Sequence, residues 1–358
     1  MSDGTKIQWT DATWSVTRGC SRVSDGCKNC YAERMAHRFS GEGGPFAGLT
    51  HATAEGPRWT GEVRLVPEAL ELPLHWRKPR RIFVDSMSDL FHKDVPDEFI
   101  SKVLAVISLA PRHTFQLLTK RPERMSRLFR SDCFWDLVDD ESSMLLEDED
   151  SPVGPGRGWN GLERRSDDAR ATAQCPTVDE PLSNLWAGVS VENQHAADER
   201  IPLLLETPAA VRWISAEPLL GDVGLFAFLR GAIRDASLAE LNCPTMPGLD
   251  WVVAGGESGP SARPVHPDWV RSIRDQCQSA GVPFFFKSWG EWSPIYSCDD
   301  DPDARTMPNM FSDRRRWINS AGGHGFHGKR VVAVERVGKK RAGRELDGRE
   351  WSEFPEAG

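Results

Sequence analysis

Short apolar runs alternate along this chain with amphipathic stretches of helical length. The apolar runs are rich in β-branched and aromatic residues and cover residues 7–16, 81–85, 114–118, 185–189, 211–214, 251–254 and 283–286. Between them, apolar residues recur at helical spacing in residues 96–109, 193–205 and 267–280. Gly281 follows the last of these stretches, where a helix C-cap is expected. This alternation is typical of a parallel sheet wrapped by helices.

Polar residues follow nearly every predicted strand. The carboxyl ends of parallel strands meet at one edge, so these side chains are expected to share one site there. The alternative is that the Ser, Asp and Glu residues among them only cap the helices that follow. The residues concerned are Ser86, Ser88, Asp89, Lys120, Arg121, Ser190, Glu192, Glu217, Gly255, Gly256, Glu257 and Lys287.

Composition and charge narrow the class of protein. The chain has 358 residues, 39% of them hydrophobic, and a formal net charge of -9, which argues against a globally basic nucleic-acid binder. Residues 136–150 hold eight acids and no base, whereas residues 329–344 hold seven bases. The stretch 133–184, which contains the acidic run and several glycines and prolines, is interpreted as an insertion that forms a lid or a disordered loop.

The chain shows neither a secretory signal pattern nor an apolar stretch of the roughly 20 residues that span a bilayer, so we expect a cytoplasmic protein without membrane contact. Eight cysteines in such a length do not resemble a disulfide scaffold. Five of them are scattered and are expected to be reduced thiols. They are Cys133, Cys175, Cys243, Cys277 and Cys298.

The other three, Cys20, Cys27 and Cys30, lie on one short loop that also contains Gly19 and Gly26. Three thiolates can converge on one centre, and three rather than four ligands leave a coordination position open. A [4Fe-4S] cluster with one free iron fits this ligand count best.

Two alternatives to the cluster stay open. His37 or His51 could complete a zinc site with the three cysteines, or the thiols could carry no metal at all. A third possibility for the chain as a whole is a hydrolase that uses Glu217, Glu257 and His92 on a bound metal, although the spacing of a His-x-x-x-His pair is lacking.

At this point the chain resembles the radical S-adenosylmethionine superfamily, and within it the phage-derived three-Cys-motif family. The resemblance lies in the stretches 14–30, 83–92, 118–125, 188–194, 215–221, 251–264, 284–292 and 336–351. The cysteine loop departs from the familiar pattern, because its spacing is Cys-x6-Cys-x2-Cys and Asn29 stands before the last cysteine, where an aromatic residue is usual.

The resemblance implies an α/β fold, a partial (β/α)6 TIM-like barrel with a C-terminal extension and an acidic insertion. Residues 1–132 and 185–292 would form the barrel, 133–184 the insertion and 293–358 the extension. It also implies that Cys20, Cys27 and Cys30 bind a [4Fe-4S] cluster and that S-adenosylmethionine is cleaved to a 5'-deoxyadenosyl radical. The cofactor would be held by Ser86, Ser88, Asp89, Ser190, Glu192, Gly255, Gly256 and Glu257.

The substrate is predicted less directly. Lys120, Glu217 and Lys287 are the candidate catalytic residues, and the basic side chains at the same edge would suit a nucleic acid or nucleotide. Trp14, Trp289 and Trp292 could stack a base, and the basic segment around Lys339, Lys340 and Arg341 could bind phosphates. An external electron donor is required. The alternative function is a zinc-stabilised protein that binds nucleic acid or a partner without catalysis.

Overall fold

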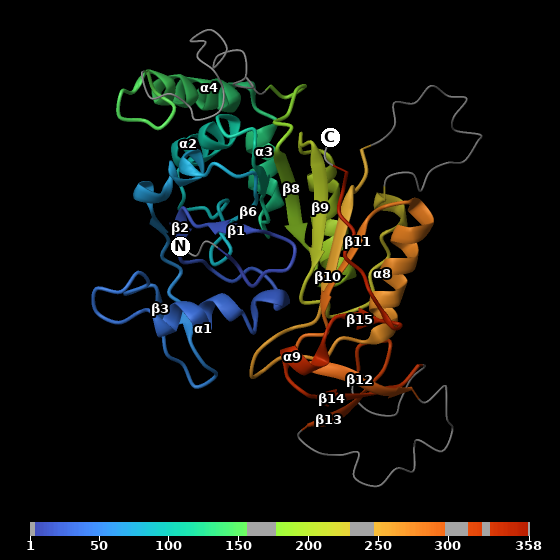
Figure 1. Cartoon of the computed structure of the whole chain (residues 1–358). Coiled ribbons are helices and arrows are strands. Elements are labelled where there is room, and N and C mark those ends of the chain that lie inside the picture. Colours follow the sequence, from blue (N-terminus) through green and yellow to red (C-terminus); the bar gives the residue numbers. More distant parts are fainter. Residues whose placement is uncertain (1–3, 156–176, 230–246, 298–313, 324–329, 357–358) are drawn as a thin grey trace, which may run out of the picture.

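The structure is a computed structural model that describes residues 4–155, 177–229, 247–297, 314–323 and 330–356. In this described part, seven parallel strands form a curled sheet shaped as a half-barrel, in the order β1-β6-β7-β8-β9-β10-β11 (Figure 1). The strands are β1 (Ala12–Trp14), β6 (Arg81–Val84), β7 (Thr114–Gln116), β8 (Leu185–Ser190), β9 (Val211–Ala216), β10 (Trp251–Gly255) and β11 (Phe284–Ser288). The α/β class and a curled parallel sheet are therefore confirmed, whereas the finer expectation, a partial (β/α)6 TIM-like barrel of the radical S-adenosylmethionine type, is not confirmed.

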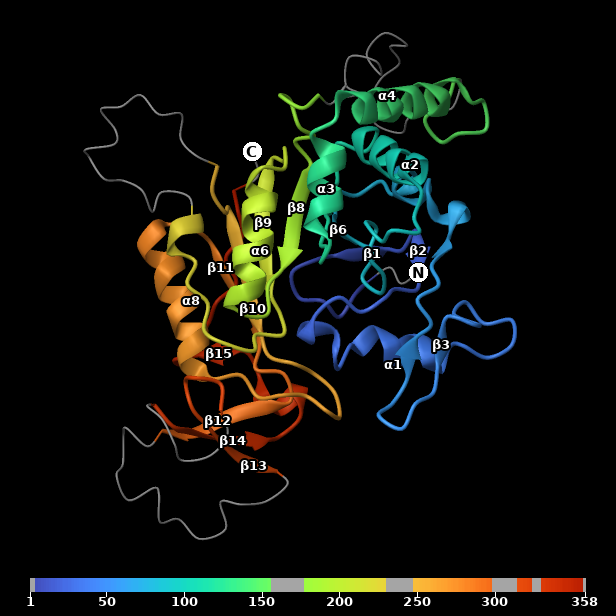
Figure 2. The ribbon, with the colours of Figure 1, turned by 180° about the vertical axis from the view of Figure 1, so that it is seen from behind.

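Helices cover the outer face of the sheet. They are α2 (Asp97–Ser108), α3 (Pro122–Phe129), α6 (Gln194–Leu205) and α8 (Pro267–Ala280), and Figure 2 shows α3, α6 and α8 in front of the strands. The bounds of α2, α6 and α8 agree with the sequence expectations to within a residue, including the left-handed Gly281 that ends α8 at φ 68°. Ile82, Leu185 and Val252 of the sheet pack with these helices in one large buried core.

The inner face of the sheet carries aromatic side chains at the amino ends of the strands. Trp186, Trp213, Trp251 and Phe285 pack with Trp9, which precedes β1. Alternate residues of a strand point to opposite faces, so the inner face continues through Gly188 and Ser190 on β8 and through Ser215 on β9. The sheet therefore has an aromatic floor, and its polar inner residues lie toward the carboxyl edge.

The first predicted strand is much shorter than expected. Of residues 7–16 only Ala12–Trp14 form β1, and the chain then leaves the main sheet in β2 (Thr17–Arg18), which pairs with β5 (Arg64–Leu65). A second small pair, β3 (Thr50–His51) and β4 (Arg58–Trp59), packs against α1 (Tyr31–Arg38). Strand β1 ends early because the Asp85 carboxylate accepts hydrogen bonds from the backbone N–H groups of residues 16 and 17, which directs the chain away from the main sheet.

Of the stretch 133–184, interpreted as an insertion that forms a lid or a disordered loop, the first part is a helix. Asp132–Glu147 form α4, and Trp135 and Val138 are buried against the helical core. The eight acids of the run 136–150 did not prevent a helix, because its apolar side chains recur on one face. Residues 156–176 lie outside the described residues, as does Cys175.

The C-terminal extension has structure of its own. An antiparallel sheet of β12 (Trp292–Ser297), β14 (Val332–Arg336) and β13 (Arg315–Ile318) is followed by α9 (Lys339–Ala342) and the hairpin β15 (Glu345–Leu346) and β16 (Arg349–Glu350). The final residues then run beside β11, where Phe285 pairs with Ser352. Cys243, Cys298 and Lys329 lie outside the described residues. Within the described ranges, no helix is long and apolar enough to span a membrane.

Candidate functional site

The three cysteines lie on the loop that joins β2 to α1, at the carboxyl edge of the sheet. Gly19 starts the loop at φ 94°, and a side chain there would meet the Glu62 carbonyl oxygen at 2.2 Å. Cys27 ends a short 3-10 turn, and Cys30 is the N-cap residue of α1. The loop is therefore shaped by its own turns before any ligand is considered.

Asp85 and Ser88, which follow β6, hold the start of this loop. The Asp85 carboxylate accepts hydrogen bonds from the backbone N–H groups of Val16 (2.9 Å) and Thr17 (3.0 Å). Ser88 donates to the Thr17 carbonyl oxygen at 2.9 Å, and Tyr31 donates to the Ser86 carbonyl oxygen. The serines that were predicted to bind the cofactor thus touch the cysteine loop itself.

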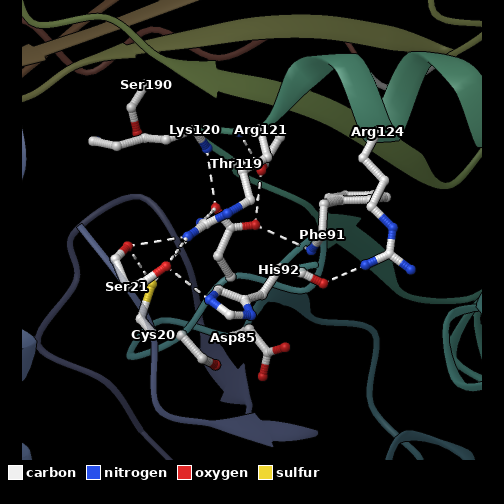
Figure 3. A network of polar contacts seen from close by, with 12 residues as sticks. Cys20, Ser21, Asp85, Phe91, His92, Thr119, Lys120, Arg121, Arg124 and Ser190 are labelled. Carbon is white, nitrogen blue, oxygen red and sulfur yellow. Dashed lines mark hydrogen bonds and ion pairs between the residues drawn. The ribbon is translucent and has the colours of Figure 1, made fainter. Parts of the chain in front are cut away.

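Asp89 and Arg121 form the centre of a buried polar network beside Cys20. Figure 3 shows Arg121, Thr119 and Cys20 of this network. Asp89 accepts from the Thr119 hydroxyl (2.7 Å), from the Arg121 guanidinium (2.7 Å) and from the backbone N–H groups of Phe91 (3.1 Å) and Lys120 (3.2 Å). All of its acceptor capacity is used inside the protein. Asp89 therefore has a structural role within this network, and the expectation that it also binds the cofactor stays a prediction.

His92 belongs to the same network and is fully buried. Its Nδ1 accepts from the Asp94 backbone N–H at 3.3 Å, which leaves Nε2 to donate to the Ser21 hydroxyl at 2.8 Å. Burial lowers the pKa of His92, and Arg121 lowers it further. A neutral imidazole is expected here at neutral pH.

The other side of the cysteine loop contacts the loops after β8 and β10. Asn29 donates to the Glu257 carboxylate at 2.9 Å, and Arg263 binds the same carboxylate with 2.7 Å between Nη2 and Oε1. A Cβ at Gly26 would lie 3.1 Å from the carboxyl carbon of Glu192. Glu257 therefore anchors the loop, rather than standing free for a cofactor.

Glu192 is buried and paired with Arg200 at 2.9 Å. Burial alone would raise the pKa of Glu192, but Lys120 and Arg200 outweigh it and hold that pKa below its usual value. Ser190, two residues earlier, is buried on the inner face, and its backbone N–H donates to the Thr119 carbonyl oxygen at 3.0 Å.

Glu217 and Lys287 face each other from β9 and β11. The Lys287 Nζ lies 3.0 Å from Glu217 Oε2, and both side chains are largely buried. A Cβ at Gly255 would meet Glu217 Oε1 at 2.4 Å, and one at Gly256 would meet the Trp289 carbonyl oxygen at 2.1 Å. The two glycines make room for these protein groups, and their predicted contact with the cofactor stays a prediction.

The cysteine thiols influence one another. Burial raises the pKa of Cys20 to about 12, Asp89, Cys30 and Cys27 add to the rise, and Arg121 opposes it. Burial also raises the pKa of Cys30. Three partly buried thiols, of which Cys20 and Cys30 have suppressed ionisation, are a donor set that a bound cation or cluster would deprotonate.

Among the described residues, no three or more His, Cys, Asp or Glu side chains converge on a point that would hold a metal ion. Three thiols on one loop are the donor type and number that a [4Fe-4S] cluster with one open iron would use. His37 bonds Thr50 at 3.0 Å on the surface, and His51 is exposed on β3. The predicted metal centre stays a prediction.

Two further expectations were wrong in detail. Trp14, Trp289 and Trp292 are buried, and each indole N–H donates to a backbone carbonyl, so none of them presents a face to a base. His92, Glu217 and Glu257 each have partners in separate networks and do not form the metal site of a hydrolase.

Sequence reasoning missed several side chains that hold the site together. Asn29, Arg200 and Arg263 carry no motif that would mark them, because their partners are chosen by the fold. A surface hollow lined by Glu123, Ser126, Arg127, Arg130, Leu203 and Glu206 lies on the outer helices and includes none of the candidate residues. Of the remaining cysteines, Cys133 is exposed and Cys277 is buried.

Comparison with known proteins gives one match, and it covers nearly the whole chain. No curated protein and no solved structure matched. The matching family model carries no described activity, and nothing found indicates the radical S-adenosylmethionine superfamily or the phage-derived three-Cys-motif family. The assignment to that superfamily is therefore corrected. The chain belongs to the family described as Protein of unknown function (DUF5131), whose model matches residues 4–355.

Proposed function

We propose that this protein is an iron–sulfur redox enzyme in which Cys20, Cys27 and Cys30 hold a [4Fe-4S] cluster with one iron open to S-adenosylmethionine. The observation that carries the proposal is the position of the three thiols, together on one loop at the carboxyl edge of the half-barrel. When bound, such a cluster supplies one electron that cleaves the sulfonium bond. The proposal rests on these residues and not on superfamily membership.

The surrounding side chains divide into two groups under this proposal. Asp85, Ser88 and Glu257 hold the cysteine loop through the hydrogen bonds described above. Lys120, Ser190, Glu217 and Lys287 remain to orient the bound molecules at the same edge. Glu217 Oε2, which accepts from Lys287 Nζ at 3.0 Å, is the group we assign to proton transfer.

The partners in this proposal follow from the chemistry. The reduction requires an external electron donor, and an oxygen-sensitive cluster suits the reducing cytoplasm. A nucleotide or nucleic acid is the proposed substrate class, since the exposed Lys340 and Arg341 on α9 offer charge to phosphates. The tryptophans give this substrate class no support.

Anaerobic reconstitution with iron and sulfide, followed by reduction in the presence of S-adenosylmethionine, tests the proposal. We expect a brown protein that forms 5'-deoxyadenosine, detected by chromatography. The variant with Cys20→Ala, Cys27→Ala and Cys30→Ala should lose both properties. Cys133→Ala is the matched control, because Cys133 is an exposed thiol on α4, outside the site.

The outcome that would reject the proposal is specific. A colourless protein that binds one zinc ion through the same three cysteines and leaves S-adenosylmethionine intact would favour the zinc-stabilised binding protein instead. Loss of iron in Cys133→Ala as well would mean that iron uptake is not specific to the loop.

A further inference from the structure

Arg121 is the cation that lies directly beside the first cysteine. Its Nη1 is 3.9 Å from Cys20 Sγ, and its Nη2 donates to both the carbonyl oxygen and the hydroxyl of Ser21 at 3.0 Å. The side chain is only 14% exposed. A guanidinium held by bonds to the residue next to Cys20 has little freedom to move away from the sulfur.

A second set of bonds fixes Arg121 from the opposite side. Its Nη1 donates to Asp89 Oδ2 at 2.7 Å, and its backbone N–H donates to Thr119 Oγ1 at 2.9 Å. The Thr119 hydroxyl in turn donates to Asp89 Oδ1. Loops after β6 and β7 therefore orient the guanidinium toward the cysteine loop, as Figure 3 shows.

The two partners of the Arg121–Asp89 ion pair differ in their effect on Cys20. The arginine carries a positive charge, which favours negative charge on the Cys20 sulfur, and the aspartate carries a negative charge, which disfavours it. Of the two groups, the guanidinium is the one that contacts the sulfur. Cys30 receives its favourable field from another source, the positive N-terminal end of α1, at which it is the N-cap.

We infer that Arg121 is a positioning residue that fixes Cys20 as a ligand and raises the reduction potential of the group held by the three cysteines, while Asp89 limits that effect. This inference rests on the proposed function. A one-electron reduction adds negative charge at the thiolates, and a fixed cation within contact distance of one of them stabilises the reduced form. Arg121 acts through Cys20 and Ser21 and is not assigned a contact with substrate.

The test measures the midpoint potential of the reconstituted protein, by anaerobic titration followed with absorbance and electron paramagnetic resonance. For Arg121→Gln we expect the ratio of reduced to oxidised clusters at a given potential to fall about tenfold, which for one electron is a shift of about 59 mV to lower potential. Asp89→Asn should shift the potential in the opposite direction. Iron and sulfide content are measured for each variant.

Arg127→Gln is the matched control. Arg127 lies on α3, is 65% exposed and pairs with Asp97 at 3.4 Å, so its loss should leave the potential unchanged. A purely structural role for Arg121 and Asp89 would lower cluster content without producing shifts of opposite sign.

The possible outcomes distinguish a failure of the proposed function from a failure of this inference. Wild-type protein that takes up no iron and sulfide overturns the proposed function and this inference with it. If wild type binds the cluster and Arg121→Gln has the same midpoint potential as wild type, only this inference is overturned. If Arg121→Gln takes up no iron and sulfide, the midpoint potential of Asp89→Asn is the deciding measurement. An unchanged or lower potential in Asp89→Asn then overturns the inference.

Discussion

Asp85 accepts two hydrogen bonds from Thr17, one from its backbone N–H at 3.0 Å and one from its hydroxyl at 2.8 Å. Asp85 directly follows β6 and has a positive φ of 55°, and Thr17 begins the path into the cysteine loop. This contact between residues that are 68 positions apart places the loop at the mouth of the half-barrel. Its strength depends on the charge of one buried carboxyl group.

We expect the stability contributed by Asp85 to fall as the pH rises. Burial raises the pKa of Asp85 from 3.8 to about 6, although its hydrogen bonds lower it. A carboxyl group with a raised pKa in the folded state contributes fully below about pH 4 and loses that contribution as pH rises through 6. Relative to Asp85→Asn, wild type should lose up to about 3 kcal/mol of unfolding free energy between pH 4 and 7. Urea denaturation at each pH measures this.

Asp11→Asn is the control for this pH dependence. Arg81 outweighs burial and lowers the pKa of Asp11, so Asp11 contributes no loss of stability with rising pH. Parallel pH profiles for wild type and Asp85→Asn would contradict the prediction.

Asn29→Asp should loosen the cysteine loop. Asn29 donates to Glu257 at 2.9 Å and to the Ser261 carbonyl at 2.8 Å, and a carboxylate in its place would lose both donors and repel Glu257. We expect a cost of about 1–3 kcal/mol and faster amide hydrogen exchange in residues 20–30. Asn29→Ala should cost less, because it adds no charge.

Gln278→Glu is the matched exchange of an amide for a carboxylate. Gln278 Nε2 lies 3.1 Å from Glu353 Oε2 at an exposed position, where solvent screens the new charge. Unchanged exchange in residues 20–30 of Asn29→Asp would show that this contact does not hold the loop.

Gly188→Ala should destabilise the inner face of the sheet. A Cβ at Gly188 would lie 2.5 Å from atoms of the Trp213 indole, which is fully buried in the aromatic floor. Overpacking of this kind costs about 1–3 kcal/mol. Gly41→Ala is the control, because no atom lies within 4 Å of its Cβ position. Equal denaturation midpoints for the two variants would contradict the predicted packing.

Phe354→Ala should lower the stability of the protein, because the C-terminal Phe354 packs on the aromatic side chains of the inner face. The Phe354 ring lies 5.2 Å from Trp251 and 5.5 Å from Phe285, and the Arg81 guanidinium stands 4.2 Å over it. We expect a loss of about 2 kcal/mol, below the usual range for a fully buried Phe because the ring is only partly buried. Thermal unfolding measures this loss, with Phe226→Ala as the control. The Phe226 side chain is 55% exposed, so its removal should change the free energy of unfolding little. An equal effect of both substitutions would count against a structural role of the tail.

Local signals were sufficient for much of the fold. Asn193 caps α6, which was expected over residues 193–205, and Gly281 ends α8, as the sequence indicates. These features depend on residues that are close together along the chain. The acidic run misled us at α4, where the apolar residues Phe134, Trp135 and Val138 were the signal that should have had more weight.

The sequence alone determined the alternation of strands and helices, the location of the polar edge and the grouping of the three cysteines, because each is set by neighbours within a few positions. Only the tertiary structure decided which polar groups are already occupied. Arg121 meets Cys20 across 101 residues and Asn29 meets Glu257 across 228. Such pairs form because parallel strands bring their carboxyl ends to one edge, and the partner that each charge finds there depends on burial and distance, which no local pattern contains.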